Sequence, residues 1–312
     1  AGPFLRRRLP STAMPLLSVV IPTHNRAARL EVAIGSVLAQ TIADLEVVIV
    51  DDGSTDDTPE VISRAQARDA RVRTLRLAGS GGAATARNAG IGAATGAFLA
   101  FLDDDDEWAP AKAERQIDYL RSHPRIGLVS CDFHIVGGGR RLHHRGPERF
   151  KPSALGWANI LMGCSFVMMH RPSFSFEPSF DESIVPAEDW DLWLRCSSER
   201  EVAIVPEPLA GYARHGVQLT GSVERLQRGD AGFFAKNEER MSANARAFHR
   251  AHLRMQGAGD ERMRARLDVM RSSPPAVIAT LARLSLSRRL GRILNDPGRP
   301  VRTLARAVER VD

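Results

Sequence analysis

The first hundred residues alternate between short apolar runs and segments with helical periodicity, and this alternation restricts the fold more than any other feature. Four apolar runs have the length and composition of buried strands: Leu17–Ile21, Leu45–Val50, Val72–Leu77 and Ala97–Leu102. Three segments between them are amphipathic or rich in small residues and are predicted helices: Arg26–Gln40, Thr58–Ala67 and Ala83–Ala94. Such alternation is typical of the α/β class, in which a mostly parallel central sheet is flanked by helices.

Polar residues gather where the predicted strands end. The first strand runs into PTHNR, the second into DDGSTDD and the fourth into DDDDEW. Ligands of parallel sheets bind at the carboxyl ends of the strands. We therefore expect these three clusters to form one site.

The rest of the chain has a less regular pattern. Two further strands are predicted at Gly127–Val136 and Ser165–His170, separated by the loop sequence GGGRRLHHRG. A helix is predicted within Ser183–Arg200, and a strand begins at Glu201–Val205. From about Phe233 the composition shifts to Arg, Ala, Met and Glu, which predicts a helical tail. We divide the chain into a flexible basic lead-in (1–15), an α/β domain (16–235) and a helical basic C-terminal extension (236–312).

Composition limits the class of protein and of partner. Hydrophobic residues make up 43% and charged residues 26%, which suits a packed globular core. The net charge of +6 favours an anionic partner, such as a nucleotide or a phospholipid surface. Nucleic acid is not expected, because the arginines are dispersed and only 6% of residues are aromatic. The chain has no run of about 18 apolar residues and its three cysteines are widely spaced, so a cytoplasmic protein is predicted.

Four consecutive aspartates, Asp103 to Asp106, follow the fourth predicted strand. Side chains alternate along a strand, so Asp103 and Asp105 can face one ligand together. Adjacent carboxylates repel one another, and Mg²⁺ or Mn²⁺ would neutralise them while phosphate oxygens and water complete its shell. The alternative is an exposed acidic turn that caps the next helix. We favour the metal site, because the cluster directly follows a buried strand of an α/β pattern.

Six motifs in order resemble those of the family 2 glycosyltransferases, which have the GT-A fold, a Rossmann-like sheet flanked by helices. They are SVVIPTHNR (18–26), SVLAQT (36–41), VVIVDDGSTDDT (47–58), ARNAGI with ATG (86–91 and 94–96), FLDDDDEW (101–108) and EDWDLWLR (188–195). Each motif alone is weak, but six in this order are specific. The resemblance covers residues 16–220 and implies a metal-dependent enzyme that moves a sugar from a nucleotide-sugar to an acceptor hydroxyl.

The resemblance implies that the first motif binds the nucleoside of the donor. Pro22 and Thr23 would touch the nucleoside, with His24, Asn25 and Arg26 beside them. Many relatives carry an aromatic residue in the HNR segment, which this chain lacks. A histidine can still stack on a base.

The resemblance assigns the rest of the donor site to three further motifs. Asp52 would hydrogen-bond a pyrimidine ring, which favours a UDP or dTDP donor, and Arg87 would lie against the base or the phosphates. Asp103 and Asp105 match the DxD motif of the family, with Asp105 the direct metal ligand and Asp103 nearer the ribose. Asp104 and Asp106 are second choices, because the run of four leaves the register open.

Asp189, in the pair Glu188-Asp189, matches the catalytic base of the family. By that resemblance the reaction is inverting: Asp189 takes a proton from the acceptor hydroxyl, which attacks opposite the leaving nucleoside diphosphate. The alternative is a pair of acids at a helix N-terminus, where the helix dipole favours them. His215 lies where relatives often have a histidine near the metal, and an ordinary surface histidine is its alternative. Trp190 and Trp193 fit core positions better than sugar platforms.

One glycine motif points to another class of enzyme. GSGGAA (79–84) lies between a predicted strand and a predicted helix, and Asp103 follows about 20 residues later. This arrangement fits the G-x-G-x-x-G/A fingerprint of dinucleotide-binding domains. A Rossmann domain carries this motif in its first βα turn, whereas here it follows the third strand. A NAD(P)-dependent oxidoreductase is therefore the less favoured alternative.

The segment 276–294 (AVIATLARLSLSRRLGRIL) combines apolar residues on one predicted helix face with arginines around it. A basic amphipathic helix of this kind can bind the inner face of the cell membrane, where a lipid-linked acceptor would be met. Packing on the catalytic domain, or a contact within a homo-oligomer, is at least as well favoured.

Together the observations predict an inverting glycosyltransferase with a divalent metal and a glycan, lipid-linked or small-molecule acceptor. A nucleotide-sugar-binding module without catalysis is the second hypothesis. The pair Glu188-Asp189 argues against it, because a module that only binds has no need of a base.

Overall fold

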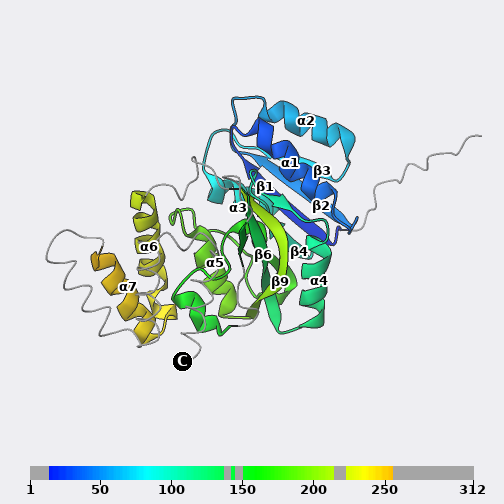
Figure 1. The fold of residues 1–312 in the computed structure, drawn as a ribbon. Coiled ribbons are helices and arrows are strands. Elements are labelled where there is room, and N and C mark those ends of the chain that lie inside the picture. Colours follow the sequence, from blue (N-terminus) through cyan, green and yellow to red (C-terminus); the bar gives the residue numbers. More distant parts are fainter. Residues whose placement is uncertain (1–13, 137–141, 145–149, 214–222, 256–312) are drawn as a thin grey trace, which may run out of the picture.

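The structure, a computed structural model, describes residues 14–136, 142–144, 150–213 and 223–255. These residues form one nine-stranded mixed sheet with helices on both faces (Figure 1). The strands are β1 (Leu17–Thr23), β2 (Leu45–Asp51), β3 (Val72–Arg76), β4 (Phe98–Phe101), β5 (Glu107–Trp108), β6 (Ile126–Val136), β7 (Leu142–His144), β8 (Met168–His170) and β9 (Glu201–Ala213). The α-helices are α1 (Ala27–Leu38), α2 (Thr58–Arg68), α3 (Ala83–Ala93), α4 (Lys112–Ser122), α5 (Glu188–Ser197), α6 (Val223–Asn237) and α7 (Ala243–Met255).

The strand order is β3-β2-β1-β4-β8-β6-β9-β5, and β7 pairs with β6. The pairs β1–β2, β1–β4, β2–β3 and β6–β9 are parallel, whereas β5, β7 and β8 run antiparallel to their neighbours. Because β1 to β4 point the same way, their carboxyl ends lie along one edge of the sheet. The three polar clusters of the sequence follow β1, β2 and β4 at this edge.

Alternating side chains give the sheet a separate core on each face. In β1, Val20 faces a core shared with α3, α5, α6 and α7, whereas Val19 and Ile21 face a core shared with α1, α2 and α4. Every residue of β1 and of β2 is buried. Parallel strands covered on both faces require such near-continuous apolar runs.

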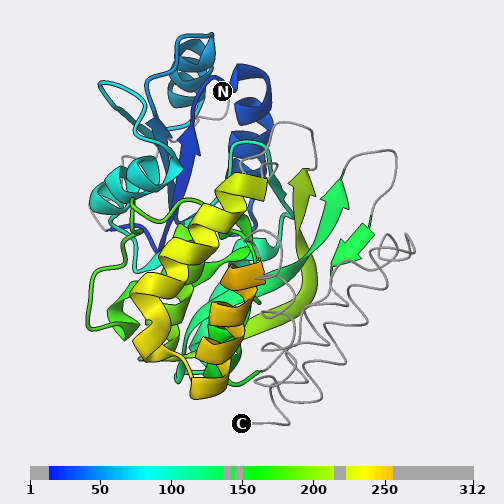
Figure 2. The same cartoon turned by 90° about the vertical axis from the view of Figure 1, so that its left-hand side faces the viewer.

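The last two described helices cover the face that carries α5. α6 and α7 lie side by side (Figure 2), and α6 packs directly on α5. Buried His249 of α7 contacts the carbonyl oxygen of Gly156 through Nε2 at 2.8 Å. α6 runs through residue 235, so one helix spans the domain boundary predicted there; the division into domains stays a prediction.

The predicted α/β class, with a mostly parallel sheet flanked by helices, is confirmed. The prediction missed α4, the two-residue strand β5, and β7, which lies in the predicted loop, and α6 begins before the helical tail that was predicted from about Phe233. β8 is shorter than predicted, because residues 164–166 form a 3₁₀ turn. Within the described part of the chain, no helix is both long and apolar enough to cross a bilayer. The segments 1–13 and 276–294 lie outside the described residues.

Candidate active site at the carboxyl edge of the sheet

The loops that follow β1, β2 and β4 meet at one place. Thr23 Oγ1 donates a hydrogen bond to Asp104 Oδ2 at 2.7 Å, which joins the end of β1 to the aspartate run after β4. His24 Nδ1 lies 2.7 Å from the carbonyl oxygen of Asp52, which joins β1 to the loop after β2. Pro22 lies inside the sheet, opposite Val50. The clustering predicted from the sequence is therefore present.

The HNR segment is anchored to the loop after β2. Asn25 has a left-handed backbone (φ 55°), and its Oδ1 accepts hydrogen bonds from the backbone N–H groups of Thr55 at 2.8 Å and Asp56 at 3.3 Å. The N–H of Arg26 donates to Thr58 Oγ1 at 3.1 Å. Asparagine tolerates left-handed geometry better than most residues, and its side chain caps the turn. These contacts hold the segment beside Asp52.

Asp52 is the centre of the glycine-rich loop. Its Oδ1 accepts the N–H of Gly81 at 2.8 Å, and its Oδ2 accepts the N–H of Gly82 and the hydroxyl of Ser80, each at 2.8 Å. The neighbouring Gly53 has φ +73°, and a Cβ there would lie 3.0 Å from the carbonyl carbon of Gly79. The dinucleotide-like motif therefore wraps a carboxylate of the protein itself. That Asp52 binds a pyrimidine stays a prediction.

Three of the four aspartates after β4 have different, well-defined partners. Asp103 forms an ion pair with Arg87, and Asp104 accepts the Thr23 hydroxyl. Burial raises the pKa of Asp104 to about 6, although the Thr23 hydroxyl lowers it. Asp106 is buried and its Oδ1 accepts the N–H of Ala213 at 2.9 Å; burial, followed by the charge of Asp103, raises its pKa well above the usual range. Asp104 and Asp106 therefore connect this loop to neighbouring segments through hydrogen bonds.

The residues at this edge fit a divalent cation. Asp103 and Asp105 are half-buried carboxylates at a strand end, and carboxylate oxygens are the ligands that Mg²⁺ and Mn²⁺ prefer. Among the described residues, no group of three or more His, Cys, Asp or Glu side chains could hold a metal. Such a site would thus use one or two protein carboxylates, with donor phosphates completing the shell. The predicted ligand His215 lies outside the described residues.

Arg87 of α3 connects the aspartate run to the start of α5. Its Nη2 donates to Asp103 Oδ1 at 2.7 Å and its Nη1 to Glu188 Oε1 at 3.0 Å. The side chain is 7% exposed, and its guanidinium lies 5.5 Å from the ring centroid of Phe180. Arg87 therefore neutralises two acids of the predicted site. In this arrangement its guanidinium is engaged by protein carboxylates.

Asp189 lies in the first turn of α5, next to Glu188. Its Oδ1 accepts the N–H of Trp190 at 2.6 Å, and its Oδ2 accepts Nδ2 of Asn159 at 3.1 Å. Burial, followed by the charge of Glu188, raises the pKa of Asp189 to about 7, whereas the two N–H donors and Arg87 lower it. A general base works best when its pKa is close to the working pH.

The backbone that leads into Asp189 is strained. Ala187, the residue before α5, has φ 145° and ψ 12°, a conformation that residues with a Cβ rarely adopt. Its N–H donates to Glu188 Oε2 at 3.0 Å. Gly229 of α6 packs against the carbonyl oxygen of Pro186 so closely that a Cβ at 229 would overlap it. Strained conformations persist where the surroundings enforce them, and they are frequent at active sites.

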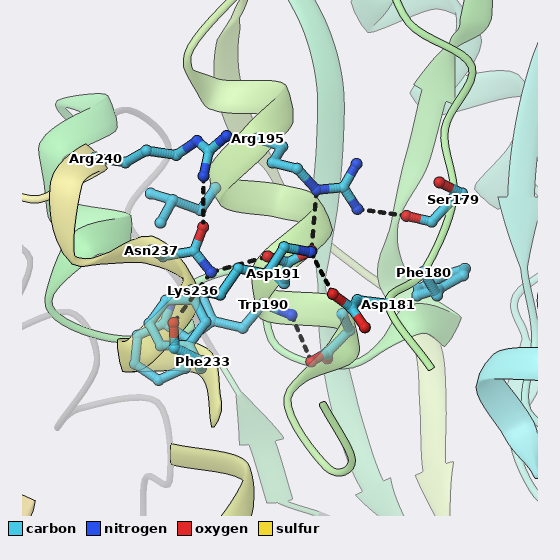
Figure 3. A network of polar contacts seen from close by, with 12 residues as sticks. Ser179, Phe180, Asp181, Trp190, Asp191, Arg195, Phe233, Lys236, Asn237 and Arg240 are labelled. Carbon is cyan, nitrogen blue, oxygen red and sulfur yellow. Dashed lines mark hydrogen bonds and ion pairs between the residues drawn. The ribbon is translucent and has the colours of Figure 1, made fainter. Parts of the chain in front are cut away.

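A network of ion pairs fixes α5 to α6 (Figure 3). Asp191, with a fully buried side chain, is paired with Arg195 Nε at 2.9 Å and Lys236 Nζ at 3.0 Å, and it accepts Nδ2 of Asn237 at 2.8 Å. Lys236 Nζ also pairs with Asp181 at 2.6 Å. A buried carboxylate needs such compensation. The network therefore makes α6 a support of the helix that carries Asp189.

Both tryptophans of α5 are packing residues, as the sequence favoured. Trp193 is fully buried in the core. Trp190 stacks on Phe233 of α6 with ring centroids 3.9 Å apart, and its Nε1 donates to the carbonyl oxygen of Leu155 at 2.6 Å.

Three contacts of this region were not found from the sequence. Asn159 holds Asp189, and Ser165 accepts the N–H of Asp103 through its hydroxyl at 3.0 Å while its carbonyl oxygen accepts Trp108 Nε1 at 2.8 Å. These residues lie in segments without a regular pattern. No spacing in the sequence could have indicated Asn159, because its partner is 30 residues away.

Residues 18–176, just over half of the chain, match Glycosyl transferase family 2. The chain is 34% identical over 164 residues to TuaG of Bacillus subtilis (strain 168), a glycosyltransferase that its name assigns provisionally to teichuronic acid biosynthesis. This alignment covers 50% of the present chain and 63% of TuaG, so the present chain spans less than two thirds of that relative.

Two further proteins are similar. The chain is 30% identical over 191 residues to the Escherichia coli UDP-Glc:alpha-D-GlcNAc-diphosphoundecaprenol beta-1,3-glucosyltransferase WfaP, covering 60% of this chain and 72% of WfaP. The fold is similar to that of the mannosyltransferase PcManGT from Pyrobaculum calidifontis, solved with GDP-Man and Mn²⁺. The TM-score is 0.62, with 19% sequence identity, 96% of this chain covered and 88% of PcManGT covered.

The oxidoreductase alternative is overturned by these findings, and the glycine motif that suggested it is explained by its contacts with Asp52. The order of the motifs, the strand order of the sheet and the family match agree. The protein has the GT-A fold, and it belongs to Glycosyl transferase family 2.

Proposed function

We propose that this enzyme is an inverting transferase that moves a sugar from a UDP- or dTDP-sugar to a hydroxyl of a lipid-linked glycan, with Asp189 as the base. The observation that carries the proposal is the carboxyl of Asp189. It is oriented by two N–H donors, and its pKa is raised to about 7 by burial and by Glu188. A side chain in this state accepts a proton from a hydroxyl near neutral pH and can release it again.

The steps of the proposed reaction involve few groups of the protein. Asp189 removes the proton of the acceptor hydroxyl while that oxygen attacks the anomeric carbon, and the nucleoside diphosphate leaves from the opposite side. General-base assistance of this kind contributes about 10²–10⁴-fold to a rate. Arg87 neutralises Glu188 beside the base, which limits the negative charge near the attacking oxygen.

A divalent cation would be held by Asp105, with Asp103 beside it and His215 as a further ligand. When bound, it would supply charge stabilisation to the leaving diphosphate. PcManGT was solved with Mn²⁺, which supports a metal in the present enzyme. The protein's own contribution is to hold the run after β4 in place, through the contacts of Thr23, Ser165 and Ala213.

The donor is proposed to be a pyrimidine nucleotide. Asp52, with His24 and Asn25 beside it, lies at the carboxyl edge where ligands of α/β sheets bind. The name of WfaP specifies UDP-Glc, which supports uridine. PcManGT was solved with GDP-Man, so a guanosine donor is the competing assignment.

The acceptor is proposed to be a sugar on a polyprenyl diphosphate. The name of WfaP specifies GlcNAc on diphosphoundecaprenol. The basic segment 276–294 would then attach the enzyme to an anionic bilayer. Flotation with phosphatidylglycerol liposomes at low salt tests the attachment: the protein should rise with the lipid, and protein that stays at the bottom contradicts it.

The first experiment is calorimetric titration with UDP, dTDP and GDP, each with Mn²⁺ or with EDTA. We expect binding of a pyrimidine diphosphate that needs the metal and that Asp105→Ala abolishes. Asp118→Ala, which removes an exposed aspartate of α4, is the matched control and should bind like the unchanged enzyme. Binding of GDP alone contradicts the pyrimidine assignment, and binding equal in EDTA contradicts the metal.

The second experiment measures transfer. The enzyme is incubated with UDP-glucose and GlcNAc-diphosphoundecaprenol, and the anomeric configuration of the product is read by NMR. A product of opposite configuration to the donor supports inversion, whereas retained configuration refutes it. Tight donor binding without any release of UDP, with or without acceptor, would favour the module that only binds.

A further inference from the structure

Asn159 donates a side-chain hydrogen bond to Asp189, although the two residues are 30 positions apart. None of the six motifs includes Asn159. We propose that Asn159 is a positioning residue that orients the Asp189 carboxylate and favours its ionised form through the Nδ2–Oδ2 hydrogen bond. This inference rests on the proposed role of Asp189 as the base. It deepens that role by assigning which neighbour controls the proton affinity of the site.

The two donors to Asp189 differ in kind. The N–H of Trp190 belongs to the backbone of α5 and would be present with any residue at 190 except proline. The amide of Asn159 comes from a different segment and depends on one side chain. A single substitution at 159 therefore separates the effect of the donor from the geometry of the helix.

Asn159 is held in place by its neighbours along the chain. Ile160 and Leu161 are buried, and the carbonyl oxygen of Leu161 accepts the hydroxyl of Ser130 in β6 at 2.8 Å. On the other side, the carbonyl oxygen of Leu155 accepts Trp190 Nε1 at 2.6 Å. The segment is thus tied both to the sheet and to α5. The amide of Asn159 is presented to Asp189 by a fixed backbone.

Stability alone does not explain an asparagine at this position. Among the described residues, Oδ1 of Asn159 is buried and has no hydrogen-bond partner. A buried carbonyl without a donor costs free energy, and a leucine of similar volume would avoid that cost. The Oδ1 group of Asn159 is therefore less favourable for folding than an apolar group in its place would be. The amide N–H that faces Asp189 is what an apolar residue cannot supply.

Some of the charged and titratable groups around Asp189 raise the pKa of its carboxyl, and others lower it. Glu188 of α5 favours the protonated form of Asp189, and Arg87 of α3 favours the ionised form. The buried thiol of Cys164 and the carboxylate of Asp103 also lie close enough to interact with this group of charges. A hydrogen bond donated to a carboxylate stabilises the ionised form. Loss of the Asn159 amide therefore raises the pKa of Asp189.

The test is the pH profile of UDP release from UDP-glucose with water as acceptor, for the unchanged enzyme and for Asn159→Ala. We expect the rising limb near pH 7 to move up by about half a unit to one unit, which corresponds to one hydrogen bond. Asn159→Asp should move it further, because a second acid beside Asp189 repels its charge. An Asn159→Ala profile lowered equally at every pH, with its midpoint unchanged, would overturn the inference.

Asn237→Ala is the matched control. It removes an amide that donates to Asp191, a carboxylate of the same helix two residues further on. We expect it to weaken the packing of α6 on α5 and to leave the midpoint of the profile where it is. A midpoint that moves equally in both variants would show a general disturbance of α5 and contradict a specific role for Asn159.

Asp189→Asn separates this inference from the proposed function. If it releases UDP like the unchanged enzyme, Asp189 is not the base and the proposed function fails. If it is inactive while Asn159→Ala keeps the normal midpoint, only the present inference fails.

Thermal unfolding from pH 5 to 9 gives a readout that does not need activity. The stability difference caused by Asp189→Asn is measured twice, once in the unchanged enzyme and once in the Asn159→Ala background. In the Asn159→Ala background this difference should level off at a higher pH, because the carboxyl of Asp189 then ionises at a higher pH. Curves that level off at the same pH in both backgrounds contradict the inference.

Discussion

Replacing Asp189 by asparagine should greatly reduce activity and, at neutral to alkaline pH, make the protein more stable. The carboxyl of Asp189 has its pKa raised to about 7 by burial and by the charge of Glu188. Folding therefore holds this carboxyl in surroundings that oppose its ionisation, although two N–H donors favour it. Asparagine keeps the shape and removes the charge.

The size of the effect follows from the two pKa values. In the unfolded chain an aspartate has a pKa near 3.9, so folding raises it by about three units, each worth about 1.4 kcal/mol. Below pH 4 both states are protonated and the charge costs nothing. Between about pH 4 and 7 only the unfolded state loses its proton, so stability falls as pH rises, by a total of up to about 4 kcal/mol. Above pH 7 the loss is constant.

The new amide also fits its neighbours. Its carbonyl can accept the N–H of Trp190, and its NH₂ can donate to Oδ1 of Asn159, the buried acceptor without a partner among the described residues, after that amide rotates. We therefore expect little loss of hydrogen bonding to offset the gain.

The assay is urea unfolding of both proteins at pH 5, 6, 7 and 8. The advantage of Asp189→Asn should grow from about 1.5 kcal/mol at pH 5 to about 4 kcal/mol at pH 8. UDP release at pH 8 should fall by about 10²–10⁴-fold. Asp191→Asn is the matched control on the same helix. It breaks a buried ion-pair network, so it should lose about 3–5 kcal/mol.

Two results would refute the reasoning. A stability difference that is the same at every pH means that the pKa of Asp189 is not raised. Reduced stability of Asp189→Asn at pH 8 means that the carboxylate is a stabilising group, which contradicts a base held in strained, desolvated surroundings.

Three further outcomes follow from the contacts around the site. Arg87→Ala should cost about 3–5 kcal/mol in a urea melt, because it leaves two carboxylates of the site without their buried cation; a loss below about 1 kcal/mol contradicts this. Gly229→Ala should destabilise by about 1–3 kcal/mol, because its Cβ overlaps the carbonyl oxygen of Pro186. Gly232→Ala, on the same helix with 3.7 Å to its nearest neighbour, should stabilise by up to about 1 kcal/mol, and equal melting temperatures of the two variants would contradict the contact. Asp52→Asn should lose about 1.5–3 kcal/mol in thermal unfolding, because an amide NH₂ would face backbone N–H donors, and an unchanged melting curve would show that the glycine loop does not depend on the carboxylate.

The sequence was informative where periodicity and burial coincide. The predicted strands of the first hundred residues match β1 to β4 within two residues at each end, because each is an apolar run in the sheet. The same pattern predicted the meeting of the clusters after β1, β2 and β4, since parallel strands share one edge. α4 was missed although Ala113, Ile117 and Leu120 have helical spacing.

The rest depends on contacts that leave no local pattern. Asp52 could be recognised by its motif, but its binding by the glycine loop needed the close approach of Gly53 to Gly79. Likewise, the pairing of Arg87 with both Asp103 and Glu188 joins residues up to 101 positions apart. Such contacts are decided by packing in three dimensions, so a linear motif gives the residue type and not its partner.

The support of α5 by α6 also bears on the order in which the site becomes complete during synthesis. β1 to β4 and the acids that follow them have all been synthesised by residue 106, and the parallel pairing of these strands uses only these residues. The turn before Asp189 is closed by Gly229, and Asp191 meets its partners only when Lys236 and Asn237 have been made. The loops proposed to bind the nucleotide are thus made early, and the surroundings of the proposed base are completed late. The proposed base would therefore reach its final surroundings only after the proposed nucleotide-binding loops have been made.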